Sequence, residues 1–254
     1  MNINLALILT VLTVVSGVVV ALYRFHLKGK WEREEGEPPG GLATLVDYSR
    51  SFFPVLLFVL VIRSFIFEPF RIPSGSMMPT LLQGDYIFVK KYSYGLRLPV
   101  SETKIVETGQ PERGDVVVFR LPSEPNVNYI KRVVGLPGDT VEYARHQLIV
   151  NGEPVSLAPG TGSGSEPAPV FVETLGEREH RILIANPANT ARDGIYVVPE
   201  GHYFMLGDNR DNSRDSRFLG AIPETHLVGE AVRIWMHMDG IEWPDWSRVG
   251  TKIE

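Results

Sequence analysis

The chain has 254 residues, a formal net charge of -5 and no cysteine. Without cysteine it has no disulfides, thiolate nucleophiles or cysteine-based metal sites. Because the charge balance is acidic and no run of Lys or Arg could follow a row of phosphates, no nucleic-acid partner is expected.

A first apolar segment runs from Leu5 to Leu22 and contains no charged residue. As a helix it would be roughly 27 Å long, close to the thickness of a hydrocarbon core. The alternative is a cleaved signal peptide. However, no cation precedes the segment, it is long for such a peptide, and Tyr23-Arg24-Phe25-His26 is a poor small-residue cleavage site. We therefore predict a first transmembrane helix over residues 1–23.

A second apolar stretch, Phe52 to Ile62, is too short to cross a bilayer by itself. Extending it back to Leu42 makes it long enough, but then Asp47 and Arg50 have to snorkel or face another helix. The alternative is a buried or interfacial helix. We predict a second transmembrane segment over residues 51–67.

The loop between these segments, residues 24–50, carries the basic residues of the N-terminal region. They are Arg24, Lys28, Lys30, Arg33 and Arg50, whereas no Lys or Arg precedes Leu5. The positive-inside rule therefore places this loop in the cytoplasm and everything after Phe67 on the opposite side of the membrane.

Beyond the second segment, short runs of β-branched and aromatic residues alternate with turns. Such runs are typical of strands, so the rest of the chain is expected to be mainly β. The predicted strands cover residues 86–90, 116–119, 129–134, 147–150, 181–185, 202–206 and 230–235.

Two connections between these strands have distinct composition. Asn151-Gly152 predicts a hairpin turn, because both residues tolerate positive φ. Residues 158–169 are rich in Gly, Ser and Pro and are expected to form an exposed loop. The glycines of this loop do not match a nucleotide-binding fingerprint.

Two serines and two prolines follow the second apolar segment, in Pro73-Ser74-Gly75-Ser76-Met77-Met78-Pro79-Thr80-Leu81. Gly75 allows another backbone to approach closely, and the prolines stiffen both flanks. In an extended chain Ser74 and Ser76 project to the same side, so one hydroxyl can attack a carbonyl while the other points at it. On this segment alone, an ordinary Ser/Pro/Gly turn is the alternative.

Lys131 lies in a predicted strand, whose alternation can turn it inward while Arg132 stays in solvent. To act as a base near neutral pH, an ammonium with a pKa of about 10.4 needs a shift of about three units, or roughly 4 kcal/mol. Burial among Tyr129, Val133 and the Ser76 segment would supply it. The alternative is a solvated Lys-Arg pair at a strand edge.

A third polar segment is Gly207-Asp208-Asn209-Arg210-Asp211-Asn212-Ser213-Arg214-Asp215-Ser216-Arg217, which interleaves three Asp with three Arg. Its charges can pair internally and fix a loop geometry. A calcium loop is the alternative, but the glycine at the turn position and the distal bidentate Glu are missing.

Together the three segments resemble bacterial type I signal peptidase, the leader peptidase family. Two further stretches extend the resemblance, Arg113 to Phe119 and Lys131 to Asp139. The resemblance implies an antiparallel β-sheet catalytic domain over residues 68–140 and 201–254, with an inserted β-subdomain over residues 141–200. One or two N-terminal transmembrane helices would anchor it.

The same resemblance implies roles for six residues. Ser76 would be the nucleophile and Lys131 the general base and then general acid, which is the Ser-Lys variant of a catalytic triad. Ser74 would donate to the oxyanion beside the Ser76 backbone N–H. In the third segment, Ser213 would orient the lysine amine, while Asp215 and Arg217 would pair to support the loop.

The implied enzyme removes N-terminal signal peptides from exported preproteins, cuts after small residues at -1 and -3, and needs no cofactor. Its partners would be preproteins and membrane phospholipid. Its location would be a bacterial inner membrane, with the catalytic domain on the periplasmic side.

Shallow apolar pockets for the small substrate side chains follow from the resemblance. By position they would be lined by Phe70, Ile72, Pro73, Met77, Leu81, Ile87, Tyr129 and Ile130. For each of these residues core packing is the alternative. Trp235, Trp243 and Trp246 could rest at a lipid interface, again with core packing as the alternative.

Two other functions stay open on the sequence. A Ser-Lys self-cleaving protease of the repressor type would carry a DNA-binding head, where this chain has an apolar segment. A non-catalytic membrane-anchored binding protein would not need Ser76 and Lys131. None of the histidines lies in a recognisable catalytic motif, although the sequence alone also leaves a Ser-His-Asp site open.

Overall fold

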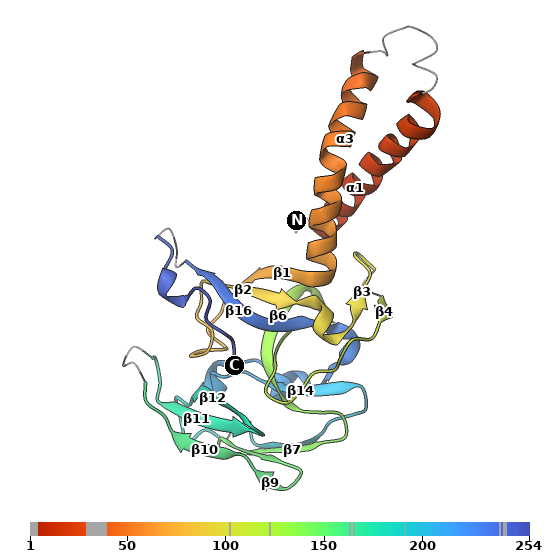
Figure 1. The fold of residues 1–254 in the computed structure, drawn as a ribbon. Helices are drawn as coiled ribbons and strands as arrows, with labels where there is room; N and C mark the ends of the chain where they lie inside the picture. Colours follow the sequence, from red (N-terminus) through yellow and green to blue (C-terminus); the bar gives the residue numbers. More distant parts are fainter. Residues whose placement is uncertain are drawn as a thin grey trace. The chain divides into compact units, whose positions relative to one another are not determined.

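The computed structural model describes residues 5–28, 40–101, 103–121, 123–162, 164, 166–190, 192–238, 240 and 243–254. Lys30 and Arg33 of the predicted loop lie outside these residues. The contacts divide the chain into two units (Figure 1). One contains the residues up to Phe67 together with Leu96–Val106, and the other contains Glu68–Gly95 together with Glu107–Glu254. Each unit is described by itself.

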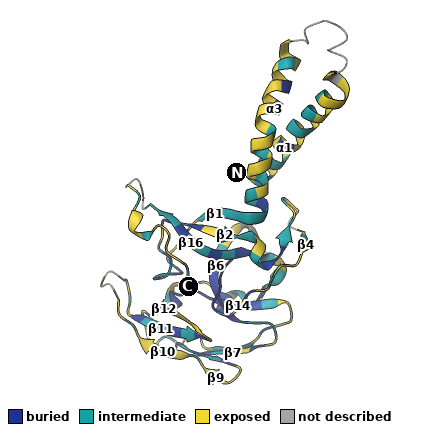
Figure 2. Ribbon diagram, in the orientation of Figure 1, coloured by how far each residue is buried: buried dark blue, intermediate teal, exposed yellow. Residues whose placement is uncertain are grey.

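The first unit contains two long apolar helices. Helix α1 (Leu5–Leu22) continues as one π-helical segment (Tyr23–Leu27), and α3 (Gly40–Val61) continues as another (Ile62–Ile66). Both helices are long and apolar enough to cross a membrane. Most of their side chains are exposed (Figure 2), as expected for a surface that faces lipid.

Helix α3 begins earlier than the sequence analysis predicted. We expected the second segment to start at residue 51 and assigned residues 24–50 to a loop, but the helix starts at Gly40. Val46 and Ser49, three residues apart on one helical face, are both buried. Residues 40–50 are therefore part of this helix and not of the predicted loop.

Polar groups within the helices find local partners. Thr10, Thr13 and Ser16 each donate their hydroxyl to the carbonyl four residues earlier. The Arg50 guanidinium lies 5.4 Å from the centre of the Tyr23 ring, so this cation faces the other helical segment. Such contacts satisfy polar side chains where no water is at hand.

The remaining strands of the first unit form a small hairpin, β3 (Leu96–Arg97) with β4 (Lys104–Val106). The sequence analysis placed these residues in the catalytic domain over residues 68–140. The contacts instead group them with the helices.

A seven-stranded sheet in the order β1-β2-β16-β5-β6-β14-β15 forms the framework of the second unit (Figure 1). Its pairs from β2 to β15 are antiparallel. The strands are β1 (Phe67–Arg71), β2 (Asp85–Lys90), β5 (Val116–Leu121), β6 (Glu124–Gly135), β14 (His202–Leu206), β15 (Ile222–Pro223) and β16 (Leu227–His237).

Two smaller sheets are built from the chain between β6 and β14. One contains β13 (Gly194–Val197), β7 (Thr140–Ala144), β8 (Gln147–Val150) and β9 (Glu153–Pro154), in that order. The other contains β10 (Ser156–Pro159), β11 (Val170–Leu175) and β12 (Arg178–Leu183). Short helices complete the unit at Lys91–Tyr94, Arg210–Asn212, Glu224–His226, Trp246–Arg248 and α4 (Ser216–Leu219).

The predicted strands and turn agree well with these elements. All seven predicted strands overlap observed ones, and residues 147–150 and 202–206 match β8 and β14 from end to end. Asn151 and Gly152 have φ angles of 53° and 81°, so the predicted hairpin turn between β8 and β9 is confirmed. We predicted a loop over residues 158–169, but β10 extends to Pro159, so the first two residues of this range belong to a strand.

The inserted strands share a core with the large sheet. Val134 of β6 and Phe204 of β14 cluster with Val141 and Tyr143 of β7 and Leu148 of β8. The Phe204 ring also packs on Tyr196 of β13 at a centroid distance of 4.7 Å. Apolar burial therefore joins residues 141–200 to the main sheet, so the insertion is not an independent unit.

This shared core predicts a stability effect. Phe204 is 1% exposed, so Phe204→Ala should lower the free energy of unfolding by about 3 to 5 kcal/mol through lost burial and a new cavity. Guanidinium unfolding followed by tryptophan fluorescence measures this change. The control is Ile195→Ala, because Ile195 of β13 is 67% exposed. An equal effect of both substitutions would contradict the shared core.

Candidate active site

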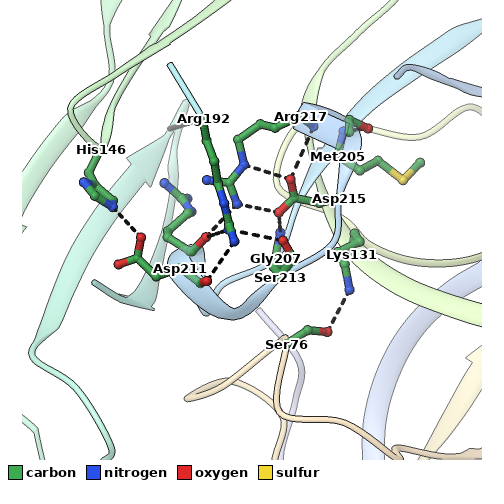
Figure 3. Close-up of polar contacts among 12 residues, drawn as sticks. Ser76, Lys131, His146, Arg192, Met205, Gly207, Asp211, Ser213, Asp215 and Arg217 are labelled. Carbon is green, nitrogen blue, oxygen red and sulfur yellow. Dashed lines mark hydrogen bonds and ion pairs between the residues drawn. The ribbon is translucent and has the colours of Figure 1, made fainter. Parts of the chain in front are cut away.

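The Lys131 amine and the Ser76 hydroxyl meet in the second unit. Lys131 Nζ donates to Ser76 Oγ over 2.7 Å and to the Ile130 carbonyl over 2.7 Å (Figure 3). Ser76 lies in the turn between β1 and β2, whereas Lys131 lies on β6. When the amine is neutral, the hydroxyl can donate to its nitrogen instead, which is the first step of general-base catalysis.

Lys131 is buried because β6 lies inside the sheet. It is 3% exposed and sits opposite Val117 of β5, while β14 pairs with the other edge of β6. The pKa of Lys131 is lowered to about 8, chiefly by burial and to a smaller extent by the Arg217 charge, while the charges of Asp215 and Asp208 oppose the shift. At pH 7 about one molecule in ten then carries the free amine.

Arg132 corrects one expectation. From strand alternation we expected it in solvent, but it is 1% exposed. Its guanidinium donates to both Asp208 oxygens, at 2.8 and 2.6 Å, and to the Gly114 carbonyl at 2.8 Å. Because both faces of β6 are covered, strand alternation moves Arg132 to the other face without bringing it to the surface.

The 207–217 loop holds the Ser76 turn. The Asn209 backbone N–H donates to the Ser76 carbonyl at 3.1 Å, and its side-chain amide donates to the Gly75 carbonyl at 3.0 Å. Ser74 Oγ lies 3.4 Å from Ser76 Oγ. The segment is a turn and not the extended chain that we expected, and this turn brings the two hydroxyls together.

Gly207 packs closely against both Ser213 and the Ser76 turn. A Cβ at Gly207 would lie 2.1 Å from Ser213 Oγ and 2.6 Å from the Ser76 carbonyl oxygen. No side chain fits there, so glycine is required by close approach.

An ion pair fixes the far end of the loop. Arg217 donates to Asp215 through Nε at 2.8 Å and Nη2 at 2.7 Å, and Asp215 also accepts from the Gly207 N–H at 3.0 Å (Figure 3). Burial by itself raises the pKa of Asp215, but the hydrogen bonds and charge of Arg217 outweigh it and keep this pKa below its usual range. The structure therefore contains the predicted pair as two opposite buried charges.

Ser213 differs from its expected role. Lys131 Nζ bonds to Ser76 and Ile130, and no hydrogen bond from Ser213 to this amine is present. The buried Ser213 hydroxyl has no partner at hydrogen-bonding geometry, although it is close enough to Asp215 to help lower the pKa of that carboxyl.

Comparison with known proteins identifies the family. The profile of the family "Signal peptidase, peptidase S26" matches residues 45–236. Signal peptidase I of Pseudomonas aeruginosa is 45% identical, over 98% of this chain and 99% of that protein. Signal peptidase I of Pseudomonas fluorescens is 51% identical over 81% of this chain and 78% of that protein.

The chain belongs to the signal peptidase family, peptidase S26. It is a serine protease of that family. A solved signal peptidase I from Enterococcus faecalis V583 is 27% identical and covers 48% of this chain and 96% of its own, with a TM-score of 0.30. The family is membrane-anchored, and the two apolar helices of this peptidase are consistent with an anchor.

The residues expected to bind substrate fall into two groups. Pro73 is exposed, and Phe70 and Tyr129 are partly buried, so their side chains are accessible. Met77, Leu81 and Ile87 are 0% exposed and belong to the core beneath the sheet. For these three the structure shows the core packing that was the alternative, and their contact with substrate stays a prediction.

Ile72 and Ile130 lie between these groups, at 3% and 7% exposure, and both also pack in this core. They border the Ser76 turn and Lys131 in sequence. Their exposed fractions leave only their edges for a substrate.

Several residues of this peptidase were not found from the sequence. Asn209 binds the Ser76 turn, and Asp208 joins Arg132 to Thr80, whose hydroxyl donates to it at 2.6 Å. Arg192, which donates to backbone carbonyls of the loop, also had no signal in the sequence. Asp208 and Asn209 stood within the segment that we singled out, but only the fold shows their partners.

The histidines of this peptidase have other partners. His146 contacts Asp211 at 2.9 Å, His180 lies 3.2 Å from Glu173, and His237 contacts Asp85 at 2.8 Å. None of these contacts involves Ser76.

The close packing at Gly207 predicts a catalytic defect. Gly207→Ala should lower kcat/KM by about 100-fold, because the new Cβ displaces Ser213 and the Ser76 turn by a large fraction of an ångström. Steady-state cleavage of a peptide substrate measures it. Gly41→Ala is the control, since nothing lies within 4 Å of a Cβ there. Parent-like turnover by Gly207→Ala would contradict the close packing.

Proposed function

We propose that this chain is a membrane-bound serine endopeptidase that removes N-terminal signal peptides from exported preproteins, cutting after small residues at -1 and -3. The observation that carries the proposal is the 2.7 Å contact between Lys131 Nζ and Ser76 Oγ inside a buried site. The relatives named signal peptidase I support the substrate class.

In the proposed mechanism, Ser76 Oγ attacks the carbonyl carbon of the -1 residue while Lys131 takes its proton. The resulting oxyanion accepts hydrogen bonds from the Ser76 N–H and the Ser74 hydroxyl. Lys131 then gives the proton to the departing amine, and water, deprotonated by the same lysine, hydrolyses the acyl-enzyme. The 3.4 Å spacing of the two serine hydroxyls supports the role of Ser74.

Lys131 has to be neutral before each attack. Its burial supports this, because desolvation favours the uncharged amine. Asp215 and Asp208 oppose the loss of the proton, but Arg217 and Arg132 pair with them and reduce their field. In this proposal Ser213, which lies buried beside Asp215, helps to hold the carboxylate that acts on the amine.

For the membrane, we propose that α1 and α3 both span, with the connection between them in the cytoplasm and the catalytic unit on the periplasmic side of a bacterial inner membrane. The positive-inside bias supports this orientation. Trp243 and Trp246 are 93% and 70% exposed and would contact phospholipid. Trp235 instead stacks with Phe88 at 5.6 Å, so it is the least available of the three.

Ser76 is tested directly by cleavage of a precursor. Detergent-solubilised parent protein should cleave a secretory precursor bearing Ala at -1 and -3 after the -1 residue, whereas Ser76→Ala should not. Mass spectrometry of the new N-terminus gives the cut position. No cleavage by the folded parent would contradict the proposed function. Cleavage by both proteins would show that another residue is the nucleophile.

Lys131 is tested by the pH profile. Because the base must lose a proton and its pKa is lowered to about 8, kcat/KM should rise with pH through a limb near that value and stay high in mildly alkaline solution. Lys131→Arg should be inactive at every pH, since guanidinium does not deprotonate in proteins. A flat profile with chemistry limiting, or substantial turnover by the Arg variant, would exclude Lys131 as the base.

A further inference from the structure

The 207–217 loop carries the charged groups that act on Lys131. They are Asp208, Asp215 and Arg217, and Arg132, the next residue on β6, is paired with Asp208. The strand on the other side, β5, places the apolar Val117 opposite the lysine. The position of this loop therefore sets the charge balance at the amine, and Gly207 and Asn209 of the loop pack on the Ser76 turn that the amine contacts.

Arg192, from the inserted chain between β12 and β13, binds the backbone of this loop. Its Nη1 donates to the carbonyls of Arg210 at 2.6 Å and Ser213 at 3.2 Å, and its Nη2 donates to the Asp211 carbonyl at 2.9 Å (Figure 3). The guanidinium carbon also lies 4.7 Å from the centre of the Phe218 ring. One planar cation thus binds three backbone carbonyls between Asn209 and Asp215.

The inserted strands make further contacts with the same loop. Glu173 of β11 pairs with Arg210, and both side chains are 1% exposed. The Leu183 N–H at the end of β12 donates to the Asp208 carbonyl at 2.8 Å. His146 contacts the Asp211 carboxylate. The loop is therefore fastened to the insertion along most of its length.

Arg192 differs from these other contacts because solvent reaches it. It lines a cavity of about 370 Å³ together with Ser213, Asp211 and Phe218. Glu173 and Arg210 face each other in the interior, so removing either would leave a buried unpaired charge and risk unfolding. Removing the Arg192 guanidinium exposes three carbonyls that water can reach, so the fold should survive while the loop loosens.

We propose that Arg192 is a positioning residue for the Ser76–Lys131 reaction: it clamps the backbone of residues 210–213 and thereby keeps the lysine amine desolvated. The proposal rests on the proposed function, in which a neutral Lys131 is the base. It also assigns the insertion a part in catalysis, since a residue from that segment acts on the loop that covers the amine.

The test compares the pH dependence of kcat/KM for the detergent-solubilised full chain and Arg192→Gln on the same peptide substrate. Loosening the loop admits water and raises the pKa of Lys131. The alkaline-rising limb should then move up by roughly 0.5 to 1 pH unit. Activity at pH 7 should fall about three- to tenfold and converge with the parent above the limb. Arg192→Lys, which keeps the charge but lacks the planar fork, should fall between the two.

Arg181→Gln is the matched control, because Arg181 lies on β12 of the same insertion with a 49% exposed side chain and a long ion pair of 3.9 Å to Glu166. It should keep the parent profile. Hydrogen exchange gives an independent readout: in Arg192→Gln, amides of residues 207–217 should exchange faster while those of β5 do not change.

An unchanged limb, or a loss by the same factor at every pH, would overturn the role of Arg192, as would the same shift in Arg181→Gln. If Arg192→Gln does not fold, the pH profile of Arg192→Lys is measured instead, and the same outcomes overturn the role. These results are distinct from failure of the proposed function. If the proposed function fails, the parent protein does not cleave the substrate, or Ser76→Ala cleaves it at the same rate as the parent.

Discussion

The site is built around one buried lysine among carboxylates. Burial disfavours the ammonium, whereas Asp215 and Asp208 favour it, and the balance leaves the pKa of Lys131 at about 8. Each of these carboxylates is bonded to its own arginine, Asp215 to Arg217 and Asp208 to Arg132. Opposite charges in contact cancel much of each other's electric field at a distance. Each ion pair therefore acts on the lysine as a dipole, which is weaker than the action of an unpaired carboxylate.

These buried ion pairs serve geometry more than stability. Desolvation of the charges offsets most of their attraction, so pairs of this kind add little net free energy to folding. The apolar clusters on the sheet supply the stabilisation instead, with Val117, Val133 and Met205 fully buried in one of them. The rigid sheet then carries Lys131, while the ion pairs and backbone contacts align the loop and the Ser76 turn around it.

The insertion belongs to this arrangement by packing as well as by polar contacts. Its strands share a core with β6, which carries the lysine, and with β14, which leads into the loop. Glu173 and Arg192 approach the loop from that side. The insertion, which has no recognisable motif in the sequence, thus contacts the 207–217 loop, which has one.

The sequence by itself determined the features that local chemistry controls. Apolar length predicted the two N-terminal helices, alternation predicted β6 with an inward Lys131, and Asn151-Gly152 predicted its turn, because each depends on a few neighbouring residues. The motif residues also pointed to the Ser76–Lys131 pair. Only the tertiary structure decided that Arg132 is buried, that Met77 and Leu81 belong to the core, and that Arg192 holds the loop. These outcomes depend on which distant segments cover each face of β6 and the loop, and such contacts between residues far apart in the chain leave no periodic signal in the sequence.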